Sequence, residues 1–357
     1  MKVIIAGGGT GGHVFPAISI AEEILARSSK NEVLFVGTEK GFEKKLLPLK
    51  GYKIEYITSG GLIGKNPVEQ AKGLYFAFKG VFSSIKILKE FKPDVVIGVG
   101  GYASGPTVLS AFLSFIPTAV CEQNSIPGFT NRLLSRFVKR VFITFENSKK
   151  YFPERKTFLT GNPIRKDLTA ASKIDQKDRN IINILILGGS QGSKKLNEDI
   201  PGCFSKINNK KIIITHQTGE KDYNMVKNTY CKSDIDANVY KFIDNMKEVY
   251  DKTDLIICRS GAGTISEITA MGIPSILVPF SHAAHDHQLL NAMFLEKKGA
   301  AIIIEENNLN SEALTRALNK IFNNNNIKKM SEISKALGKP QAASEIVNHI
   351  EMIIRKN

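Results

Sequence analysis

Short apolar runs, rich in β-branched residues, alternate along the chain with longer stretches whose apolar residues recur at helical spacing. Apolar residues three or four positions apart form one face of a helix, whereas short continuous apolar runs are typical of buried strands. This alternation predicts a parallel sheet wrapped by helices. In the first half we expect strands at residues 2–6, 32–36, 53–57, 94–99, 118–121 and 141–144.

The same pattern starts again in the second half, with strands expected at residues 182–187, 211–215, 238–241, 254–258, 275–279 and 301–304. Between the halves, Gly161 and Pro163 interrupt the pattern and predict a boundary with a hinge near Pro163. Residues 341–354 have the spacing of one more helix, and residues 323–329 resemble a solvated loop. We therefore expect two α/β domains, 1–162 and 163–339, and a C-terminal helix within 340–357.

Length and charge narrow the class of protein. A chain of 357 residues suggests about two domains. Its net charge of +15 favours an anionic partner, which can be a nucleic acid, an anionic lipid surface or a phosphorylated small molecule. The four cysteines have no CxxC spacing, which favours a reducing cytoplasm over a disulfide framework. The most apolar stretch, residues 107–121, is broken by Pro117, so we expect no transmembrane segment.

Two glycine-rich turns each follow a predicted strand and lead into a predicted helix. They are GGGTGGH at Gly7–His13 and GGSQGS at Gly188–Ser193. Glycine permits positive φ and a close approach of the backbone to a ligand, and the free amides at a helix N-terminus attract anions. Each turn therefore predicts a site for a phosphate group.

The first turn has more than one interpretation. Gly7, Gly9 and Gly12 match the dinucleotide-binding fingerprint, for which Glu39 is the nearby ribose-binding candidate. A tight structural turn fits the same residues. His13 is a candidate for proton transfer because an ordinary histidine pKa lies near neutrality, although a capping or packing role remains open.

The second half contains a further helix start at Arg259–Glu267. Gly261 and Gly263 open this helix, and Glu267 lies about one turn inside it, where a carboxylate can accept two hydrogen bonds from a ribose diol. The amides before Glu267, together with Ser190, can hold a diphosphate. A capped helix with a favourable acidic residue near its start explains the same pattern.

Two polar clusters carry weaker signals. His282, His285 and His287 lack a supporting cysteine or a second carboxylate cluster, so we expect no metal there and assign His287 and Gln288 to hydrogen bonds with hydroxyls. Asp234 and Asp236 form an Asp-x-Asp pattern in a polar connector, which we interpret as surface charge.

Six motifs together resemble one enzyme family. They are GGGTGGHVFPA at Gly7–Ala17, GVGGYASGP at Gly98–Pro106, EQNSIPGFTNR at Glu122–Arg132, TGNPIR at Thr160–Arg165, GGSQGS at Gly188–Ser193 and RSGAGTISEI at Arg259–Ile268. In this order they resemble the N-acetylglucosaminyltransferases that convert lipid I to lipid II in bacterial peptidoglycan synthesis. The resemblance extends to about Ala301, and Cys121 departs from it because the family often has histidine there.

The resemblance implies the GT-B fold, in which two Rossmann-like domains face a cleft and a C-terminal helix returns to the N-terminal domain. It implies a peripheral enzyme on the cytoplasmic face of the cell membrane, with UDP-N-acetylglucosamine, lipid I and an anionic membrane surface as partners. Other cell-wall synthesis proteins are possible partners, and neither a cofactor nor a nucleic acid is expected.

Site residues follow from the same resemblance, with uracil near Phe242 and Ile243. The residues expected to bind the donor are Thr10, Gly11, Gly12, Asn124, Arg165, Ser190, Ile243, Ala262, Gly263, Thr264, Ile265, Ser266, Glu267 and Gln288. Those expected to bind the acceptor are Gly100, Gly101 and Ser104.

The chemistry is expected to be metal-independent. An inverting transfer makes the anomeric carbon oxocarbenium-like while UDP leaves as an anion, which amide dipoles and Arg165 can stabilise. The muramyl 4-hydroxyl must lose a proton, for which His13 is the first candidate base and Glu122 the second. Domain closure about Thr160–Arg165 would orient both substrates and exclude water.

Residues 71–92 combine an apolar stripe with flanking lysines. The residues assigned to membrane contact are Lys72, Leu74, Tyr75, Phe78, Lys79, Phe82 and Lys86. Such a basic amphipathic helix can lie in an anionic interface. The sequence alone favours an ordinary helix with a buried face, whereas the resemblance favours membrane contact.

Three other functions remain open at this point. An NAD-type oxidoreductase would use the first turn, and a sugar-nucleotide epimerase would use the same fold without a lipid acceptor. A nucleic-acid binder would explain the charge, but the chain has no Trp and no known basic-aromatic module.

Overall fold

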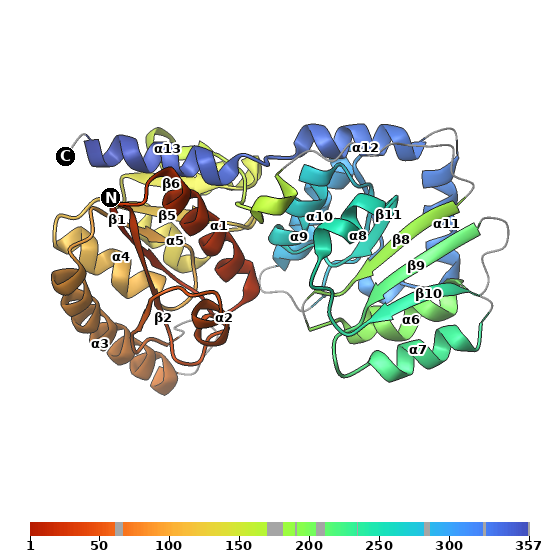
Figure 1. Ribbon diagram of the computed structural model, residues 1–357, viewed down its shortest axis with the longest axis horizontal. Coiled ribbons are helices and arrows are strands. Elements are labelled where there is room, and N and C mark those ends of the chain that lie inside the picture. Colours follow the sequence, from red (N-terminus) through yellow and green to blue (C-terminus); the bar gives the residue numbers. More distant parts are fainter. Residues whose placement is uncertain are drawn as a thin grey trace. The chain divides into compact units, whose positions relative to one another are not determined.

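The computed structural model describes residues 1–60, 67–169, 181–189, 191–204, 211–233, 235–281, 286–323 and 326–355. The chain divides into two compact units. Unit 1 comprises Met1–Lys166 and Pro340–Asn357, and unit 2 comprises Asp167–Lys339. Figure 1 shows that each unit has its own sheet and its own covering helices.

Seven strands form the parallel sheet of unit 1, in the order β3-β2-β1-β4-β5-β6-β7. They are β1 (Lys2–Ala6), β2 (Glu32–Gly37), β3 (Ile54–Tyr56), β4 (Val95–Gly98), β5 (Thr118–Glu122), β6 (Arg140–Ile143) and β7 (Thr157–Leu159). Ala6 at the end of β1 pairs with Gly98 at the end of β4. The strand order reverses between these two strands, and in open α/β sheets ligands bind outside the carboxyl ends at this point.

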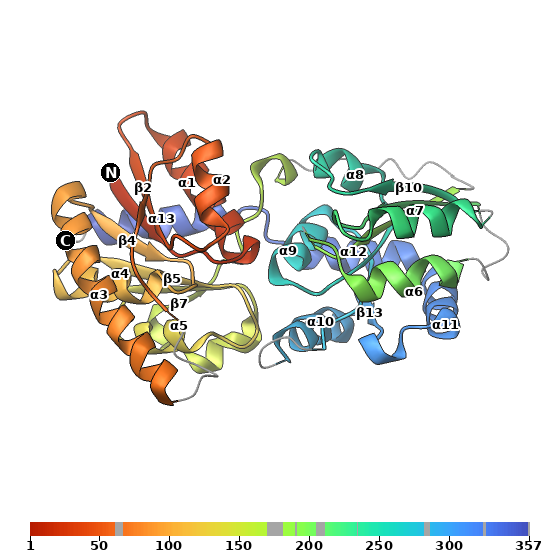
Figure 2. The same ribbon diagram turned by 90° about the horizontal axis from the view of Figure 1, so that it is seen from below.

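Helices cover both faces of the unit 1 sheet (Figures 1 and 2). They are α1 (Gly11–Arg27), α2 (Glu43–Leu49), α3 (Pro67–Phe91), α4 (Ser104–Leu113), α5 (Phe129–Leu134) and α13 (Ala342–Arg355), with short 3₁₀ turns at Glu146–Tyr151, Glu154–Lys156 and Lys166–Leu168. Alternate residues of β1 enter different cores because strand side chains alternate in direction. Val3 and Ile5 pack with α1 and α13, whereas Ile4 and Ala6 pack with residues of α3 and α4.

Helix α13 comes from the end of the chain but packs beside α1 in unit 1, as Figure 1 shows. Arg27 at the end of α1 donates to the carbonyl oxygen of Ser344 at 3.0 Å and to the carboxylate of Glu351 at 3.1 Å. Ile346 and Ile350 are fully buried in the same core. The C-terminal helix therefore completes one face of unit 1.

Six strands form the parallel sheet of unit 2, in the order β10-β9-β8-β11-β12-β13. They are β8 (Ile181–Leu187), β9 (Lys211–Gln217), β10 (Asp236–Tyr240), β11 (Leu255–Cys258), β12 (Ser275–Leu277) and β13 (Ala301–Ile303). The strand order reverses between β8 and β11, where Leu187 pairs with Cys258. Unit 2 thus repeats the arrangement of the first six strands of unit 1.

The helices of unit 2 also lie on both faces of its sheet, and Figure 2 shows α6 beside α7. They are α6 (Lys194–Phe204), α7 (Tyr223–Cys231), α8 (Met246–Lys252), α9 (Ala262–Met271), α10 (His287–Lys298), α11 (Ser311–Phe322) and α12 (Asn326–Leu337), with a 3₁₀ turn at Glu306–Asn308. Gly272 ends α9 with φ of 70°, a left-handed conformation that favours glycine. None of the helices in the described ranges is long and apolar enough to cross a membrane.

The predicted pair of parallel α/β sheets is confirmed. Two local predictions were wrong, and one strand was missed. Residues 326–329 begin α12 instead of a loop, because asparagine and lysine residues obscure its amphipathic pattern. Asp236 begins β10 instead of lying in a connector, and β7, which has only three residues, was not predicted because so short a strand has no periodic signal.

Candidate functional site

Three loops of unit 1 that carry predicted site residues follow neighbouring strands. The Gly7–Gly12 turn follows β1, the Gly100–Gly101 turn follows β4, and residues 123–128 follow β5. Because β1, β4 and β5 are adjacent and parallel, the three loops lie at the same carboxyl edge of the sheet. This edge includes the reversal of strand order, where a ligand is expected.

The first two of these turns pack backbone against backbone. The Gly8 N–H donates to the Gly100 carbonyl oxygen at 3.2 Å. Gly100 and Gly101 have φ of 94° and 81°, and a Cβ on Gly101 would overlap the backbone of Gly8. The glycines expected to bind the acceptor thus also permit the two turns to meet.

Ser104, the third residue expected to bind the acceptor, is fully buried at the start of α4. A Cβ on Gly98 would overlap the hydroxyl oxygen of Ser104, so this hydroxyl packs against the last residue of β4. The sequence motif gives the position of Ser104 but does not show which way its side chain points.

His13 is half-buried in the first turn of α1. Its Nδ1 lies 3.0 Å from the carbonyl oxygen of Gly8. A carbonyl only accepts, so Nδ1 carries the proton and the lone pair of the neutral ring is on Nε2. Thr10 and Gly12, which flank half-buried Gly11, are exposed and open to a ligand.

Glu122, the second candidate base, organises the loop after β5. It is 3% exposed and accepts hydrogen bonds from the backbone N–H groups of Asn124 (3.0 Å) and Gly128 (3.1 Å) and from the side chain of Asn131 (2.9 Å). Burial raises the pKa of Glu122 and outweighs the lowering by these hydrogen bonds. The oxygens of Glu122 therefore already have partners inside the protein.

In unit 2 the corresponding loops follow β8 and β11. Residues Gly188–Ser193 follow β8, and Arg259–Gly261 follow β11 and lead into α9. Gly261 is the N-cap of α9 and provides no side-chain cap. The expected diphosphate contacts Ala262, Gly263, Thr264, Ile265 and Ser266 form the first turn and a half of this helix, whose first amides have no acceptor within the helix. Ser190 lies outside the described residues.

Glu267 has a partner that the sequence did not reveal. Tyr250 of α8 is fully buried, and its hydroxyl donates to Glu267 Oε2 at 2.9 Å. Glu267 itself is half-buried. The two residues are 17 positions apart on different helices, which hid the pair from motif analysis.

Gln217, at the end of β9, connects two parts of the predicted donor site. Its side-chain nitrogen donates to the Gly189 carbonyl oxygen at 2.9 Å, and its side-chain oxygen accepts from the Ile243 N–H at 2.8 Å. The Ile243 N–H therefore already has a partner inside the protein. Phe242 beside it is 52% exposed and can cover a nucleobase.

The buried side chain of Arg259 connects several loops of unit 2 by hydrogen bonds. It donates to the Ser193 hydroxyl at 2.8 Å, to the carbonyl oxygens of Val278 and Pro279, and to the carboxylate of Glu306. Burial alone would raise the pKa of Glu306, but hydrogen bonds from Ser281 and Arg259 lower it to about 2. The charge of Arg259 is thus matched inside the protein.

Of the remaining residues expected to bind the donor, Gln288 belongs to unit 2, and Asn124 and Arg165 belong to unit 1. The side-chain oxygen of Gln288 in α10 accepts from the Phe280 N–H at 3.0 Å, and its carbonyl accepts from the Ser260 hydroxyl at 2.8 Å. Asn124 and Arg165 are half-buried in unit 1.

A metal site finds no support in the described ranges, which contain no cluster of three or more histidine, cysteine, aspartate or glutamate residues able to hold an ion. His282 and His285 lie outside those ranges, as does Asp234.

The apolar stripe of α3 is exposed. Tyr75, Phe78 and Phe82 are 55%, 63% and 60% exposed. Lys79 lies over the Tyr75 ring at 4.8 Å from its centroid, and Lys86 pairs with Glu90 at 3.8 Å. These aromatic residues therefore do not form the buried face of an ordinary helix. The side chains of Lys72 and Leu74 lie outside the described part of the chain.

A second exposed apolar pair, which the sequence did not reveal, lies at the end of the adjoining helix α4 and just after it. Ser110 of α4 donates to the Val81 carbonyl oxygen of α3 at 3.1 Å. Leu113 and Phe115 follow and are 58% and 93% exposed.

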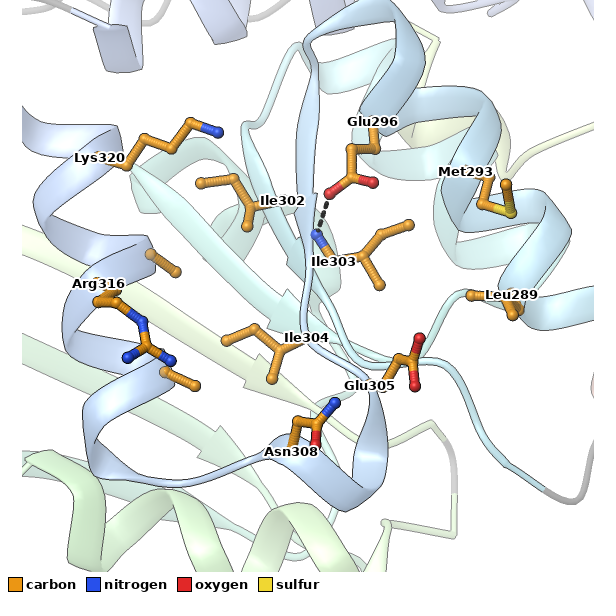
Figure 3. Close-up of a pocket in the computed structure, with 12 residues that line it drawn as sticks. Leu289, Met293, Glu296, Ile302, Ile303, Ile304, Glu305, Asn308, Arg316 and Lys320 are labelled. Carbon is orange, nitrogen blue, oxygen red and sulfur yellow. Dashed lines mark hydrogen bonds between the residues drawn. The ribbon is translucent and has the colours of Figure 1, made fainter.

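A pocket of about 710 Å³ lies in unit 2 between α10, β13 and α11 (Figure 3). Its lining includes none of the predicted site residues. Glu296 accepts the N–H of Ile303 on the edge strand β13 at 2.8 Å, which blocks a group that another strand could use.

Both units match known domains. Residues 3–143 match the glycosyltransferase family 28 N-terminal domain, and residues 183–346 match the glycosyltransferase family 28 C-terminal domain. The chain therefore belongs to glycosyltransferase family 28.

Comparison with individual proteins shows which members of this family the chain is similar to. The chain is 44% identical over 362 residues, covering 100% of both chains, to the UDP-N-acetylglucosamine–N-acetylmuramyl-(pentapeptide) pyrophosphoryl-undecaprenol N-acetylglucosamine transferase of Geobacter sulfurreducens. The crystal structure of Acinetobacter baumannii MurG is 33% identical with a TM-score of 0.83, over 98% of this chain and 99% of that chain. The UDP-GlcNAc 2-epimerase from Neisseria meningitidis, at 16% identity and a TM-score of 0.67 over 99% and 100% of the two chains, shares the fold alone.

Proposed function

We propose that this protein transfers N-acetylglucosamine from UDP-N-acetylglucosamine to the muramyl 4-hydroxyl of lipid I, with inversion at the anomeric carbon, to form lipid II. The observation that carries this proposal is the 44% identity, over the whole chain, to a transferase named for these substrates. The site geometry supports it, because each unit places glycine-rich turns at the reversal of its strand order.

Unit 2 is the proposed donor side. The first amides of α9 bind the diphosphate, Glu267 accepts from the ribose hydroxyls, and Phe242 covers the uracil. Gln217 already uses the Ile243 N–H, so the uracil contact at this residue falls to its carbonyl oxygen. Gln288 and Asn124 are the proposed contacts of the sugar.

The proposed reaction is a displacement without a metal ion. The acceptor oxygen forms a bond to the anomeric carbon while the bond to UDP breaks, and the electron pair leaves with the diphosphate. His13 Nε2 takes the proton of the 4-hydroxyl, because Nδ1 is committed to Gly8. Arg165 and the α9 amides stabilise the departing anion.

Unit 1 is the proposed acceptor side, and it also contacts the membrane that holds the polyprenyl chain. The exposed aromatic residues of α3 and the exposed Phe115 after α4 would enter the interface, while lysines such as Lys79 attract anionic headgroups. A peripheral position on the cytoplasmic membrane face follows from this role.

The test incubates the protein with radiolabelled UDP-N-acetylglucosamine and either lipid I or a short-chain analogue, with and without a chelator. We expect label in the lipid product under both conditions. Folded protein that leaves the lipid unlabelled would reject the transferase, and loss of transfer with chelator would reject the metal-independent form. Conversion of the donor to its epimer without lipid would favour the epimerase function instead.

A further inference from the structure

A buried carboxylate from outside the glycine motif reaches the first glycine-rich turn. Glu43 is the first residue of α2 and is only 1% exposed. Its Oε2 accepts the Gly9 N–H at 2.6 Å, and its Oε1 accepts the Thr38 N–H at 3.0 Å and the Thr38 hydroxyl at 3.2 Å. Three donors meet this carboxyl group, which suits the ionised form because that form only accepts hydrogen bonds.

The backbone around Glu43 is shaped to admit this group. A Cβ on Gly8 or Gly41 would overlap the carboxyl atoms, and a Cβ on Gly37 would lie 2.7 Å from Glu43 Cγ. Gly8 also has φ of 152°, within the region that side chains rarely adopt. The Glu43 carboxylate thus accepts from the Gly9 amide in the first turn, and this amide would otherwise be available to a phosphate group.

The same peptide group also contacts the candidate base. The peptide between Gly8 and Gly9 gives its N–H to Glu43, and its carbonyl oxygen accepts the Nδ1 proton of His13 at 3.0 Å. An anion on the N–H of a peptide makes its carbonyl oxygen more negative through amide resonance, so the two hydrogen bonds strengthen each other. One peptide group therefore links a carboxylate to an imidazole.

The other edge of the imidazole lies against a glycine. A Cβ on Gly100 would lie 2.9 Å from His13 Nε2. The hydrogen bond on Nδ1 fixes the tautomer, and the lack of a side chain on Gly100 admits the ring in this orientation.

We propose that Glu43 is a positioning residue for His13, acting through the Gly8–Gly9 peptide. It holds the Nδ1–H tautomer, leaves Nε2 as the basic atom and stabilises the imidazolium that forms when Nε2 takes the acceptor proton. No proton moves to Glu43. The inference rests on the proposed function for the role of His13 as base, but the carboxylate–peptide–imidazole link is a property of the protein without substrate.

The first measurement uses the unmodified protein. Long-range ¹H–¹⁵N spectra of histidine-labelled protein resolve its six histidines, and the signal lost in His13→Gln assigns His13. We expect neutral His13 to be the Nδ1–H tautomer, with a strongly hydrogen-bonded Nδ1 proton. A neutral His13 with its proton on Nε2 would overturn the proposal, without reference to any activity.

The second measurement removes the charge. Glu43→Gln keeps the size of the side chain and an acceptor for the Gly9 N–H, and we expect the Nδ1 proton signal to move upfield. We also expect kcat to fall about tenfold with donor KM unchanged, the lower range seen when an outer carboxylate partner of a metal-bound histidine is removed. The matched control is Glu55→Gln in β3, which makes the same change at an exposed position of unit 1 and should leave the His13 signal and kcat at wild-type values.

The outcomes separate the two claims. A wild-type His13 signal and kcat in folded Glu43→Gln would overturn the role of Glu43. Absence of transfer by the unmodified protein would overturn the proposed function, while the spectra would still decide whether Glu43 acts on His13.

Discussion

In unit 1 the glycine-rich turn after β1 receives a carboxylate from its own chain, whereas in unit 2 the turn after β8 is held by an amide and a guanidinium group. Glu43 accepts from Gly9 in the first turn, while Gln217 donates to Gly189 and Arg259 donates to Ser193 in the second. The difference teaches that similar glycine spacing serves different ends. In the function that we propose, the first turn holds the base in place, whereas in unit 2 the anion binds to helix α9.

The largest expected effect comes from the base of unit 1. We expect His13→Ala to lower turnover by about 100- to 10,000-fold, the usual contribution of a general base. UDP affinity should stay at the wild-type value, because the proposed UDP contacts belong mainly to unit 2. Turnover kinetics and calorimetric titration with UDP measure the two quantities. Wild-type turnover would remove His13 from the mechanism.

The next effect concerns the carboxylate of unit 2. Glu267→Ala should raise the donor KM about 10- to 100-fold, because hydrogen bonds to a charged group contribute about 1.5–3 kcal/mol. The value of kcat should change little. Steady-state kinetics at saturating acceptor make this comparison, and a lowered kcat with normal KM would contradict a ribose-binding role.

Acid should lower the stability of unit 2 near the Gly188–Ser193 turn. Burial lowers the pKa of His216 to about 3, and its ring bonds to Asn197 of α6, the helix that follows the turn. The unfolded chain takes up a proton below the ordinary histidine pKa of about 6.5, while the folded chain resists until about pH 3, so stability falls as pH falls through this window.

His216→Gln tests this acid effect because glutamine keeps an amide at the site and does not titrate. Between pH 6 and pH 4, we expect the wild-type free energy of unfolding to fall by about 1.4 kcal/mol per pH unit more than that of the variant. Urea unfolding at several pH values measures both slopes. Parallel slopes would show that His216 does not cause the effect.

A smaller effect is expected from the tyrosine behind Glu267. Tyr250→Phe should raise the donor KM about three- to tenfold, the value of one hydrogen bond of about 0.5–1.5 kcal/mol. The same change made in Glu267→Ala should have no further effect on KM, because the hydroxyl then has no carboxylate to position. Equal effects in both backgrounds would contradict this coupling.

The smallest effect concerns the exposed helix α3. Lys79→Glu should weaken binding to anionic vesicles several-fold, since a lysine near such a surface contributes about 1 kcal/mol. Lys86→Glu should weaken it less, because Lys86 already pairs with Glu90. Sedimentation measures the binding, and turnover of a soluble acceptor analogue is the control. Equal binding by both variants and the wild type would mean that α3 does not face the membrane.

The sheets and the edge that carries the site were predictable, because short apolar runs and the glycine turns after them are local features. Strand β7 and the start of α12 escaped prediction because one is too short for a period and the other begins among polar residues.

Within the site, local motifs located His13 and Glu267 but not the groups that hold them. Glu43 is 34 residues from Gly9, and Tyr250 is 17 residues from Glu267, so only the folded chain brings each pair together. The direction of Ser104 also depended on packing, since a serine after a glycine turn looks the same in sequence whether it faces a ligand or the core.

A crystal structure with bound UDP-N-acetylglucosamine tests the contrast between the two turns most directly. We predict uridine beside Glu267, the diphosphate at the first amides of α9, and Glu43 still hydrogen-bonded to Gly9. A diphosphate bound to the Gly9 amide, with the Glu43 carboxylate displaced, would contradict the account.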